Sequence, residues 1–246
     1  MSIAEIRIAP LIIKMTAPLH IGTGFRRGLV HRTVLRDGAG QAFLPASTLK
    51  GRVRSACESL LPALGLSHCH APYPQSMVAC RREECLVCRV FGAPGRGSEL
   101  YWHDAILKDW INPKVHSREM VVHGQFHTRT QVQLSRARGL AAEAHLYSSE
   151  ASAPNMIFEA PLGIAGYLEL TPIMGEADWS YELLLLLAGL KLVHTVGGEV
   201  SRGLGQCEIT VPEQILVNGE AQAVSTILDN IGLLDCWNDE KGGCHG

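Results

Sequence analysis

The segment PASTLKGRVR, residues 45–54, marks the point at which a strand is expected to end and a helix to begin. Pro45 stops the strand, and Ser47 or Thr48 is expected to cap the helix, because hydroxyl oxygens accept hydrogen bonds from the first helical N–H groups. Apolar residues then recur at the spacing of one helical face, at Leu49, Val53, Cys57, Leu60 and Leu61. The opposite face carries Lys50 and Arg54.

Apolar segments on both sides of this helix predict strands. Upstream, Ile6–Met15 is expected to be a core strand and Val34–Leu44 its hairpin neighbour. Downstream strands are expected at Glu99–Leu107, Ala165–Ile173 and Gln206–Val211. A second, strongly apolar helix is expected from its N-cap, Ser180, through His194.

This order of strands and helices predicts the fold class. Strands and a helix come first, and a strand, a helix and a strand follow, with long inserts between the elements. This order indicates an α+β fold with a ferredoxin-like sheet rather than a doubly wound one. A chain of 246 residues can form one elaborated domain with a core that needs no disulfides.

Composition leaves room only for a local nucleic-acid surface. Apolar residues make up 46% of the chain and the formal net charge is −2, so no global charge indicates a polyanionic partner. The cations nevertheless cluster in three groups: Arg26, Arg27, Arg32 and Arg36; Lys50, Arg52 and Arg54; and Arg129, Arg136 and Arg138. This clustering predicts one basic face.

The sequence predicts a cytoplasmic protein without a membrane partner. The N-terminus lacks the charged and then apolar pattern of a signal peptide. The most apolar run, Leu183–Leu192, is interrupted by Gly189 and is too short to cross a bilayer.

The cysteine spacing predicts a metal site. Cys80, Cys85 and Cys88 form a Cys-x4-Cys-x2-Cys pattern, preceded by His68-Cys69-His70. Zinc in structural sites takes four nitrogen or sulfur ligands, and here the fourth is Cys69 or a flanking histidine. The polar neighbours of these cysteines disfavour the alternative of ordinary buried thiols. The motifs of catalytic zinc sites are missing, so the zinc is expected to be structural.

Two segments suit phosphate binding. The start of the helix at residues 45–54 combines N–H groups, two hydroxyls and three cations, although a capped, solvated helix would have the same sequence. Residues 197–205, with the sequence GGEVSRGLG, offer a backbone that phosphates can approach closely. They lack the Gly-Lys-Ser/Thr ending of a nucleotide-binding P-loop and could also be a plain turn.

Together these two segments, the stretch CLVCRVFG (residues 85–92) and Leu100–Ala105 resemble the RAMP superfamily. The resemblance is to the guide-RNA-binding backbone subunits of type III-like CRISPR effector complexes. The motif order also fits, with Gly22-Thr23-Gly24 after the first strand and the glycine-rich segment near the C-terminus. The resemblance covers nearly the whole chain.

The resemblance implies one domain, residues 1–246, with an RRM-like βαββαβ core. A zinc-binding insertion would occupy about residues 66–98, and a thumb hairpin that wedges between guide nucleotides about residues 113–160, with Val115–Tyr147 as the projecting part. Residues 213–246, which include Cys236, Cys244 and His245, are expected to form a mobile tail without a function.

The resemblance also implies site residues and partners. Guide RNA (crRNA) would contact Gly22, Gly24, Arg26, Arg27, His31, Ser47, Thr48, Lys50, Arg52, Arg54, Ser201, Arg202 and Gly203, with Arg129, Arg136 and Arg138 on the thumb. Binding would rest on charge and shape and would weaken as salt rises. The expected partners are target RNA, copies of the same chain in a head-to-tail filament, and other subunits of an antiviral ribonucleoprotein, including a separate nuclease.

Cleavage of target RNA by this chain is not expected. Target-cleaving relatives carry an aspartate in the loop after the first strand, whereas Phe25–Arg36 contains no acid and His31 stands at that place. The next carboxylate, Asp37, is expected to belong to the following strand. An imidazole beside Arg32 is a poor ligand for magnesium.

Two other functions remain open from the sequence. One is an endoribonuclease that cleaves target RNA or processes crRNA, with His31 as general acid or base. The other is a zinc-containing interaction module that binds no RNA, in which the basic clusters would serve solubility.

Overall fold

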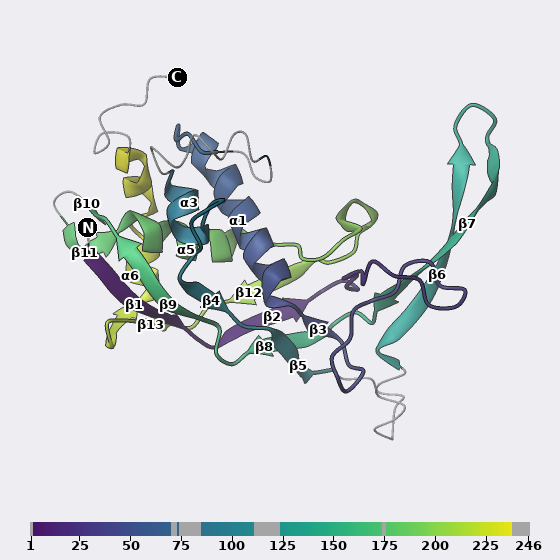
Figure 1. Ribbon diagram of the computed structural model, residues 1–246, viewed down its shortest axis with the longest axis horizontal. Helices are drawn as coiled ribbons and strands as arrows, with labels where there is room; N and C mark the ends of the chain where they lie inside the picture. Colours follow the sequence, from purple (N-terminus) through teal and green to yellow (C-terminus); the bar gives the residue numbers. More distant parts are fainter. Residues whose placement is uncertain (1, 70–72, 74–84, 111–123, 174–175, 238–246) are drawn as a thin grey trace.

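The fold is α+β, with helices α1, α3 and α5 gathered on one side of two antiparallel sheets (Figure 1). The computed structural model describes residues 2–69, 73, 85–110, 124–173 and 176–237. One five-stranded sheet has the order β14-β13-β1-β9-β4 and the other the order β12-β2-β8-β5-β3.

Four chain segments contribute one strand to each of these sheets. They are β1 (Ser2–Ile8) with β2 (Leu11–Met15), β4 (Leu100–Trp102) with β5 (Ala105–Asp109), β8 (Ile157–Ala160) with β9 (Ile164–Leu170), and β12 (Cys207–Thr210) with β13 (Gln214–Val217). The neighbours pair antiparallel in both sheets. The same four segments therefore lie in the same spatial order on both sides of a common bend.

The bend has local causes. Pro10 separates β1 from β2 and has no N–H to donate to a neighbouring strand. Gly163, between β8 and β9, has φ +52°, and a Cβ there would clash with the Ile8 carbonyl group. Ile6–Met15 and Glu99–Leu107 are each predicted to be one strand. Each is two strands in the structure, because these segments are interrupted at the bend between the two sheets.

The remaining elements complete the core and its attachments. They are β3 (Phe43–Leu44), α1 (Ala46–Ala63), α3 (Leu86–Phe91), β6 (Phe126–Ser135), β7 (Leu140–Ser152), β10 (Pro172–Ile173), β11 (Glu176–Ser180), α5 (Tyr181–Leu192), η1 (Val200–Arg202), β14 (Glu220–Ala223), α6 (Val224–Leu228) and η2 (Ile231–Cys236). Among the described residues, no helix is long and apolar enough to span a membrane.

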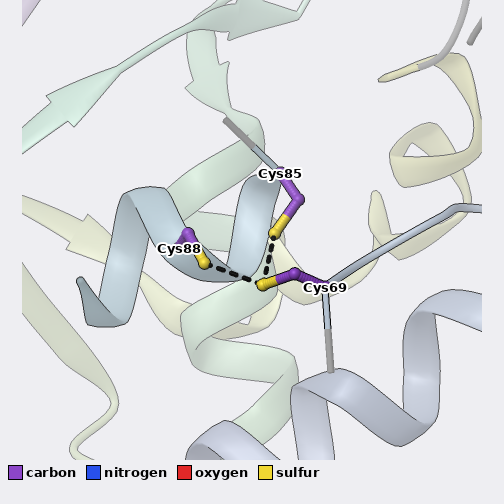
Figure 2. A group of neighbouring side chains, drawn as sticks. All are labelled: Cys69, Cys85 and Cys88. Atoms are coloured by element: carbon purple, nitrogen blue, oxygen red, sulfur yellow. Dashed lines mark hydrogen bonds between the residues drawn. The ribbon is translucent and has the colours of Figure 1, made fainter. Parts of the chain in front are cut away.

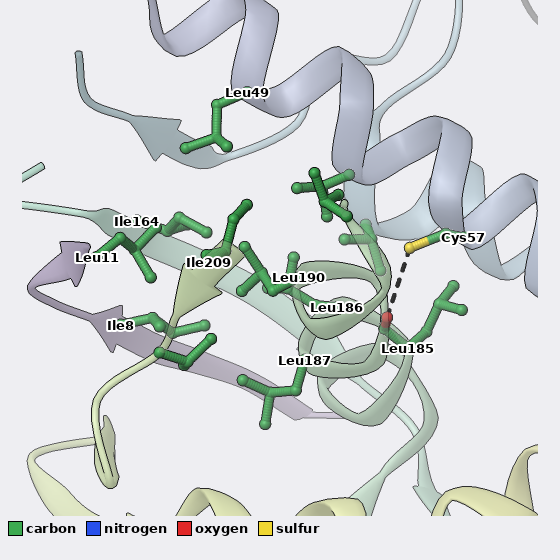
Figure 3. Packing of buried hydrophobic residues seen from close by; sticks show 14 of the residues in the cluster. Ile8, Leu11, Leu49, Cys57, Ile164, Leu185, Leu186, Leu187, Leu190 and Ile209 are labelled. Atoms are coloured by element: carbon green, nitrogen blue, oxygen red, sulfur yellow. Dashed lines mark hydrogen bonds between the residues drawn. The ribbon is translucent and has the colours of Figure 1, made fainter. Parts of the chain in front are cut away.

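Helix α5 is the centre of the hydrophobic core. Its residues from Tyr181 through Leu190 are all buried, which explains why its sequence is apolar on every face. It packs against α1, whose buried residues Leu49, Val53, Cys57 and Leu61 confirm the predicted apolar face (Figure 3).

The predicted capping of α1 by Ser47 or Thr48 is wrong. The helix begins at Ala46 with Pro45 as its N-cap and no side-chain capping bond. The Ala46 N–H instead donates to Asp104 Oδ1 at 2.7 Å. Ser180 does occupy the N-cap position of α5, as predicted, but its side chain makes no capping hydrogen bond.

A two-stranded hairpin, β6–β7, projects away from the body of the protein (Figure 1). This hairpin confirms the projecting hairpin predicted from the segment Val115–Tyr147. Residues 115–123 of that predicted segment lie outside the described residues. The strand predicted over Val34–Leu44 is wrong apart from β3, which pairs with β5 rather than with the first strand. The mobile tail predicted after Pro212 is also wrong through Trp237, because β13, β14, α6 and η2 pack there.

Candidate nucleic-acid interface and metal centre

Three segments that are distant in the sequence meet at the N-terminal end of α1. They are the loop after β2, the first turns of α1 and the glycine-rich loop before β12. Together they line a pocket of about 440 Å³. Its lining consists of His20, Ile21, Gly22, Ser47, Thr48, Gly51, Arg52, Ser55, Gly197 and Gly198.

A second pocket of about 470 Å³ adjoins the first, since His20, Gly22 and Gly198 line both. Its other lining residues are Gly24, Phe25, His31, Arg32, Thr33 and Glu199. We call the two pockets together the groove. Two adjoining pockets suit an extended chain better than a compact ligand.

Backbone contacts hold the loops of the groove together. Arg52 Nη2 donates to the Gly197 carbonyl at 2.5 Å, and the Gly198 N–H donates to the His20 carbonyl at 2.7 Å. Gly197 has φ +78°, and a Cβ on it would lie 2.6 Å from the His20 oxygen. The approach of the two loops therefore requires glycine at this position.

His20 presents one ring nitrogen to the groove. The residue is 6% exposed, and its Nδ1 donates to the Glu150 carbonyl at 2.6 Å. Nδ1 is thereby engaged, and Nε2 is the ring nitrogen left on the side of the groove. Nε2 faces the backbone of Gly22, where an added Cβ would lie 3.4 Å away. His20 is not among the site residues predicted from the sequence, where its one signal is its place directly before Ile21-Gly22.

A charged cluster closes the second pocket. Glu199 Oε1 lies 3.0 Å from Arg32 Nη1 and 3.4 Å from Arg202 Nη1. Both guanidinium groups also lie near the ring of Tyr147, 5.6 and 5.8 Å from its centroid. Arg202 in addition donates to Gln131 Oε1 at 2.7 Å. The cluster joins the two loops of the groove to Gln131 and Tyr147, which pair with each other midway along the β6–β7 hairpin.

Three cysteines converge beside α1 and α3. Figure 2 shows the three sulfur atoms directed toward one another. Cys69 Sγ lies 3.0 Å from Cys88 Sγ and 3.6 Å from Cys85 Sγ. The three sulfur atoms lie within 4.8 Å of one another. Thiolates on a tetrahedral zinc ion, with Zn–S bonds of 2.3 Å, lie about 3.8 Å apart. The three cysteines could therefore hold a metal ion.

A sequence model of the RAMP superfamily matches residues 12–208. The chain belongs to the RAMP superfamily. Among solved structures, a chain in the cryo-EM structure of the type III-B Cmr-beta complex bound to cognate target RNA has a similar fold, with a TM-score of 0.54 and 15% sequence identity. That similarity covers 91% of this chain and 98% of the other. A search of the curated proteins finds no match.

In this RAMP-superfamily chain, the predicted RNA-binding residues other than Lys50 and Arg54 fall into three places. Gly22, Gly24, His31, Ser47, Thr48 and Arg52 line the groove. Arg26, Arg27, Ser201, Arg202 and Gly203 are exposed on its two loops. Arg129, Arg136 and Arg138 are exposed on the hairpin, with the last two in the β6–β7 turn.

Lys50 and Arg54 lie on a different side of α1 from the groove residues. Arg54 donates to Glu58 at 2.8 Å, to the Gly92 carbonyl at 3.0 Å and to Cys88 Sγ at 3.7 Å. Burial lowers the pKa of Arg54, but the hydrogen bond that Arg54 donates to Glu58 and the nearby Cys88 raise that pKa overall. Burial and the adjacent Arg54 lower the pKa of Lys50. The tertiary structure thus connects Arg54 to the cysteines.

The predicted metal ligands of the RAMP chain are partly described. Cys69, Cys85 and Cys88 converge, while Cys80 and His70 lie outside the described residues. His68 is half-buried, and its Nδ1 lies 2.9 Å from the carbonyl of Cys69. Both Cys80 and the flanking histidines thus stay candidates for the fourth ligand.

Proposed function

We propose that this chain is a guide-RNA-binding backbone subunit of a type III-like CRISPR effector complex, acting in the cytoplasm. The observation that carries the proposal is the groove, in which glycine-rich backbone, hydroxyls and cations from three distant segments converge. The similar chain of the Cmr-beta complex comes from an assembly bound to target RNA. Membership of the RAMP superfamily supports the same class of partner.

The proposed core is ferredoxin-like, within a single domain spanning residues 1–246. Counting each bent segment as one strand, the chain order is β1–β2, α1, β4–β5, β8–β9, α5, β12–β13. Across each sheet, the fourth of these bent segments lies beside the first, the first beside the third, and the third beside the second. All neighbouring segments pair antiparallel. This order supports the split βαβ arrangement, in which both helices cover one face of the sheet.

The groove would hold the sugar-phosphate chain without reading its bases. Ser47 and Thr48 are not used as helix caps, so their hydroxyls are available at the first turn of α1, beside the Ser47 N–H. Arg52 adds a fixed cation, and the exposed Arg26 and Arg27 add two mobile ones. Phosphate contacts of this kind bind any sequence and weaken with salt.

The β6–β7 hairpin is the proposed thumb, within residues 113–160. Isolated two-stranded hairpins are marginally stable in water, so a projecting hairpin is expected to pack against a partner. Arg129, Arg136 and Arg138 give it a basic surface for guide or target RNA. We propose that the partner surface belongs to the next copy of the chain, in a head-to-tail filament that other effector subunits complete.

We propose that the chain does not cleave RNA. The fold brings two carboxylates, Glu150 and Glu199, to the loop that lacks an aspartate. Glu150 accepts hydrogen bonds from Arg36 at 2.6 Å and from the Val34 N–H at 3.0 Å. Glu199 is shared by two arginines. Carboxylates paired in this way are poor ligands for the magnesium ion that backbone scission requires.

The metal site is proposed to be structural zinc, within an insertion spanning about residues 66–98. Cys69, Cys85, Cys88 and a fourth ligand, Cys80 or a neighbouring histidine, would hold it. Bound zinc would supply cross-linking of this long insertion to α3 and no reaction chemistry. Arg54, which contacts Cys88 Sγ, would orient that thiolate.

The test is to purify the chain with its nucleic acid, sequence the RNA and measure the length of the assembly. The proposal predicts a crRNA-like guide and salt-sensitive binding of single-stranded RNA. The assembly is then incubated with complementary RNA with and without magnesium. Magnesium-dependent cuts that require this chain would overturn the non-cleaving role. Cuts without a metal that disappear in His31→Ala would support the endoribonuclease, and absence of RNA binding would favour the interaction module.

A further inference from the structure

Glu199 combines three features that are unusual in a groove for phosphates. It is an acid on the glycine-rich loop, where its negative charge repels a polyanion. Its backbone has φ +57°, in the left-handed region that non-glycine residues seldom adopt. Its side chain is only 6% exposed although it lines the second pocket. These features cost free energy, so a compensating role is expected.

The two carboxylate oxygens of Glu199 are used very differently. Oε1 binds both Arg32 and Arg202. Oε2 is buried and, among the described residues, has no hydrogen-bond partner. A buried acceptor without a donor is costly, and each oxygen of a carboxylate can accept two hydrogen bonds. A donor on a bound ligand would satisfy Oε2.

We propose that Glu199 accepts a hydrogen bond from the ribose 2′-hydroxyl of the bound strand and so makes the groove select RNA over DNA. This inference rests on the proposed RNA-binding function. The last torsion of a glutamate side chain is soft, and Glu199 lines the second pocket, so rotation of the carboxylate would present one of its oxygens to a ligand bound there. The 2′-hydroxyl is the group by which proteins distinguish the two nucleic acids.

A carboxylate acceptor at this position suits a sugar hydroxyl better than the other groups of a nucleic acid. A phosphate offers only acceptors and is repelled by a carboxylate. Exocyclic amines of bases are donors, but they vary with sequence, whereas a ribose is present at every nucleotide. A strand with a phosphate beside Arg52 in the first pocket would place an adjacent sugar near the second, because His20, Gly22 and Gly198 line both pockets.

The positive charges of Arg32 and Arg202, both within 3.4 Å of Glu199 Oε1, would offset its repulsion of the strand. An ionised acceptor makes stronger hydrogen bonds than a neutral one. Arg32 is about half exposed, with 52% of its side-chain surface accessible, so it can also reach a phosphate. The cluster would then bind the sugar and the backbone of one nucleotide together.

The test compares three single-stranded homopolymers with uracil as the base: RNA, DNA and 2′-deoxy-2′-fluoro RNA. Uracil has no exocyclic amine, and the fluoro sugar keeps the pucker of RNA but donates no hydrogen bond. Affinities of the full-length chain are measured by fluorescence anisotropy at one salt concentration. Loss of one hydrogen bond to a charged group predicts that the wild type binds RNA about tenfold more tightly than the fluoro strand.

Two variants and a control make the result decisive. In Glu199→Ala the RNA-to-fluoro ratio should fall to about one. In Glu199→Gln, which keeps an acceptor, the ratio should be intermediate while all three strands bind more tightly, because a negative charge is gone. Glu220→Gln removes an exposed acid on β14, outside the lining of both pockets, and should keep the wild-type ratio. Circular dichroism and thermal unfolding verify that each variant is folded.

Some outcomes overturn the inference alone. One is an RNA-to-fluoro affinity ratio near one in the wild type although its RNA binding is salt-sensitive. Another is an RNA-to-fluoro ratio in Glu199→Ala that equals the wild-type ratio. A preference that appears only with adenine or cytosine strands would identify a base amine as the donor and would overturn it as well. Absence of salt-sensitive binding to any strand would instead overturn the proposed function.

Discussion

Arg89 of α3 and Glu182 of α5 form a buried ion pair, with Arg89 Nε 2.7 Å from Glu182 Oε1 and side-chain exposures of 2% and 0%. Thr171 completes the network: its N–H donates to Glu182 Oε2 at 2.8 Å, and its hydroxyl accepts from Arg89 at 3.0 Å. The pair therefore fixes α3, which carries Cys88, to the central helix of the core.

The first prediction concerns this ion pair. Arg89→Met should lower the free energy of unfolding by about 3–5 kcal/mol, because Glu182 is left buried without its charge partner. Urea denaturation measures the loss. The double variant Arg89→Met/Glu182→Met should recover most of it, since two apolar side chains can replace a buried pair. A double variant no more stable than Arg89→Met would show that the unpaired charge of Glu182 does not cause the loss of stability in Arg89→Met.

The second prediction concerns the contact between α1 and α5. A Cβ added at Gly189 would clash with Cys57 Sγ and lie 3.2 Å from Val53 Cγ1. Gly189→Ala should therefore push the helices apart and cost about 1–3 kcal/mol of stability. The matched control is Gly51→Ala on α1, where an added Cβ meets nothing within 4 Å. There, alanine should be neutral or stabilising by up to about 1 kcal/mol.

The third prediction concerns the cysteine cluster. If zinc binds Cys69, Cys85 and Cys88, a strong chelator should lower the thermal midpoint of the purified chain, and added zinc should restore it. Cys88→Ser should lower the midpoint and the zinc content, measured by mass spectrometry. Cys57→Ser is the control, because Cys57 is buried between helices and donates to the Leu185 carbonyl. A zinc content unchanged in Cys88→Ser would exclude the site.

The fourth prediction separates two arginines of one helix. Arg52→Ala should weaken binding of single-stranded RNA and reduce the dependence of log K on log salt by about one, because one phosphate contact is lost. Arg54→Ala should change RNA binding less and zinc affinity more, since its guanidinium contacts Cys88 and Gly92. Binding titrations and chelator competition measure the two effects.

A variant outside the groove tests this fourth prediction further. Arg7→Ala removes an exposed cation of β1 with the same change in net charge. Its RNA affinity should stay near that of the wild type. Equal losses in Arg7→Ala and Arg52→Ala would mean that only net charge matters, which contradicts a specific groove.

The fifth prediction concerns pH. Burial, and to a lesser degree the charge of Arg129, lower the pKa of His127 at the start of β6. The unfolded chain, with an ordinary histidine pKa of about 6.5, therefore binds the proton more readily than the folded chain does. The stabilising contribution is present above the unfolded pKa and is lost as pH falls through the folded pKa. Urea midpoints should fall less with acidification in His127→Gln than in the wild type.

Much of the fold followed from local patterns in the sequence. The apolar spacing of Leu49, Val53, Cys57 and Leu61 placed the buried face of α1, and the apolar run from Leu183 placed α5. Such patterns work because helical periodicity depends only on neighbours within a few residues. The bend at Pro10 could not be predicted in the same way, because it depends on Gly163 approaching Ile8 from a distant strand.

The candidate site divides in the same manner. The glycines at 22 and 197–198, the hydroxyls at 47 and 48, and the cysteine spacing were visible in the sequence, because each is a local motif. The sequence also placed Lys50 and Arg54 on the polar face of α1, but it held no information about which neighbour that face meets. The direction of Arg54 toward Cys88 and the arrival of Glu199 between Arg32 and Arg202 depend on contacts across many residues.

By itself, the sequence determined the family resemblance, the two helices, the projecting hairpin and the chemistry available on each segment. Only the tertiary structure decided which of these groups face one another: the groove, the paired carboxylates and the buried Oε2 of Glu199. The physical reason is range. Propensity, capping and periodicity act within a turn or a strand, whereas a binding surface is made by pairings between segments that the chain brings together only when the core is buried.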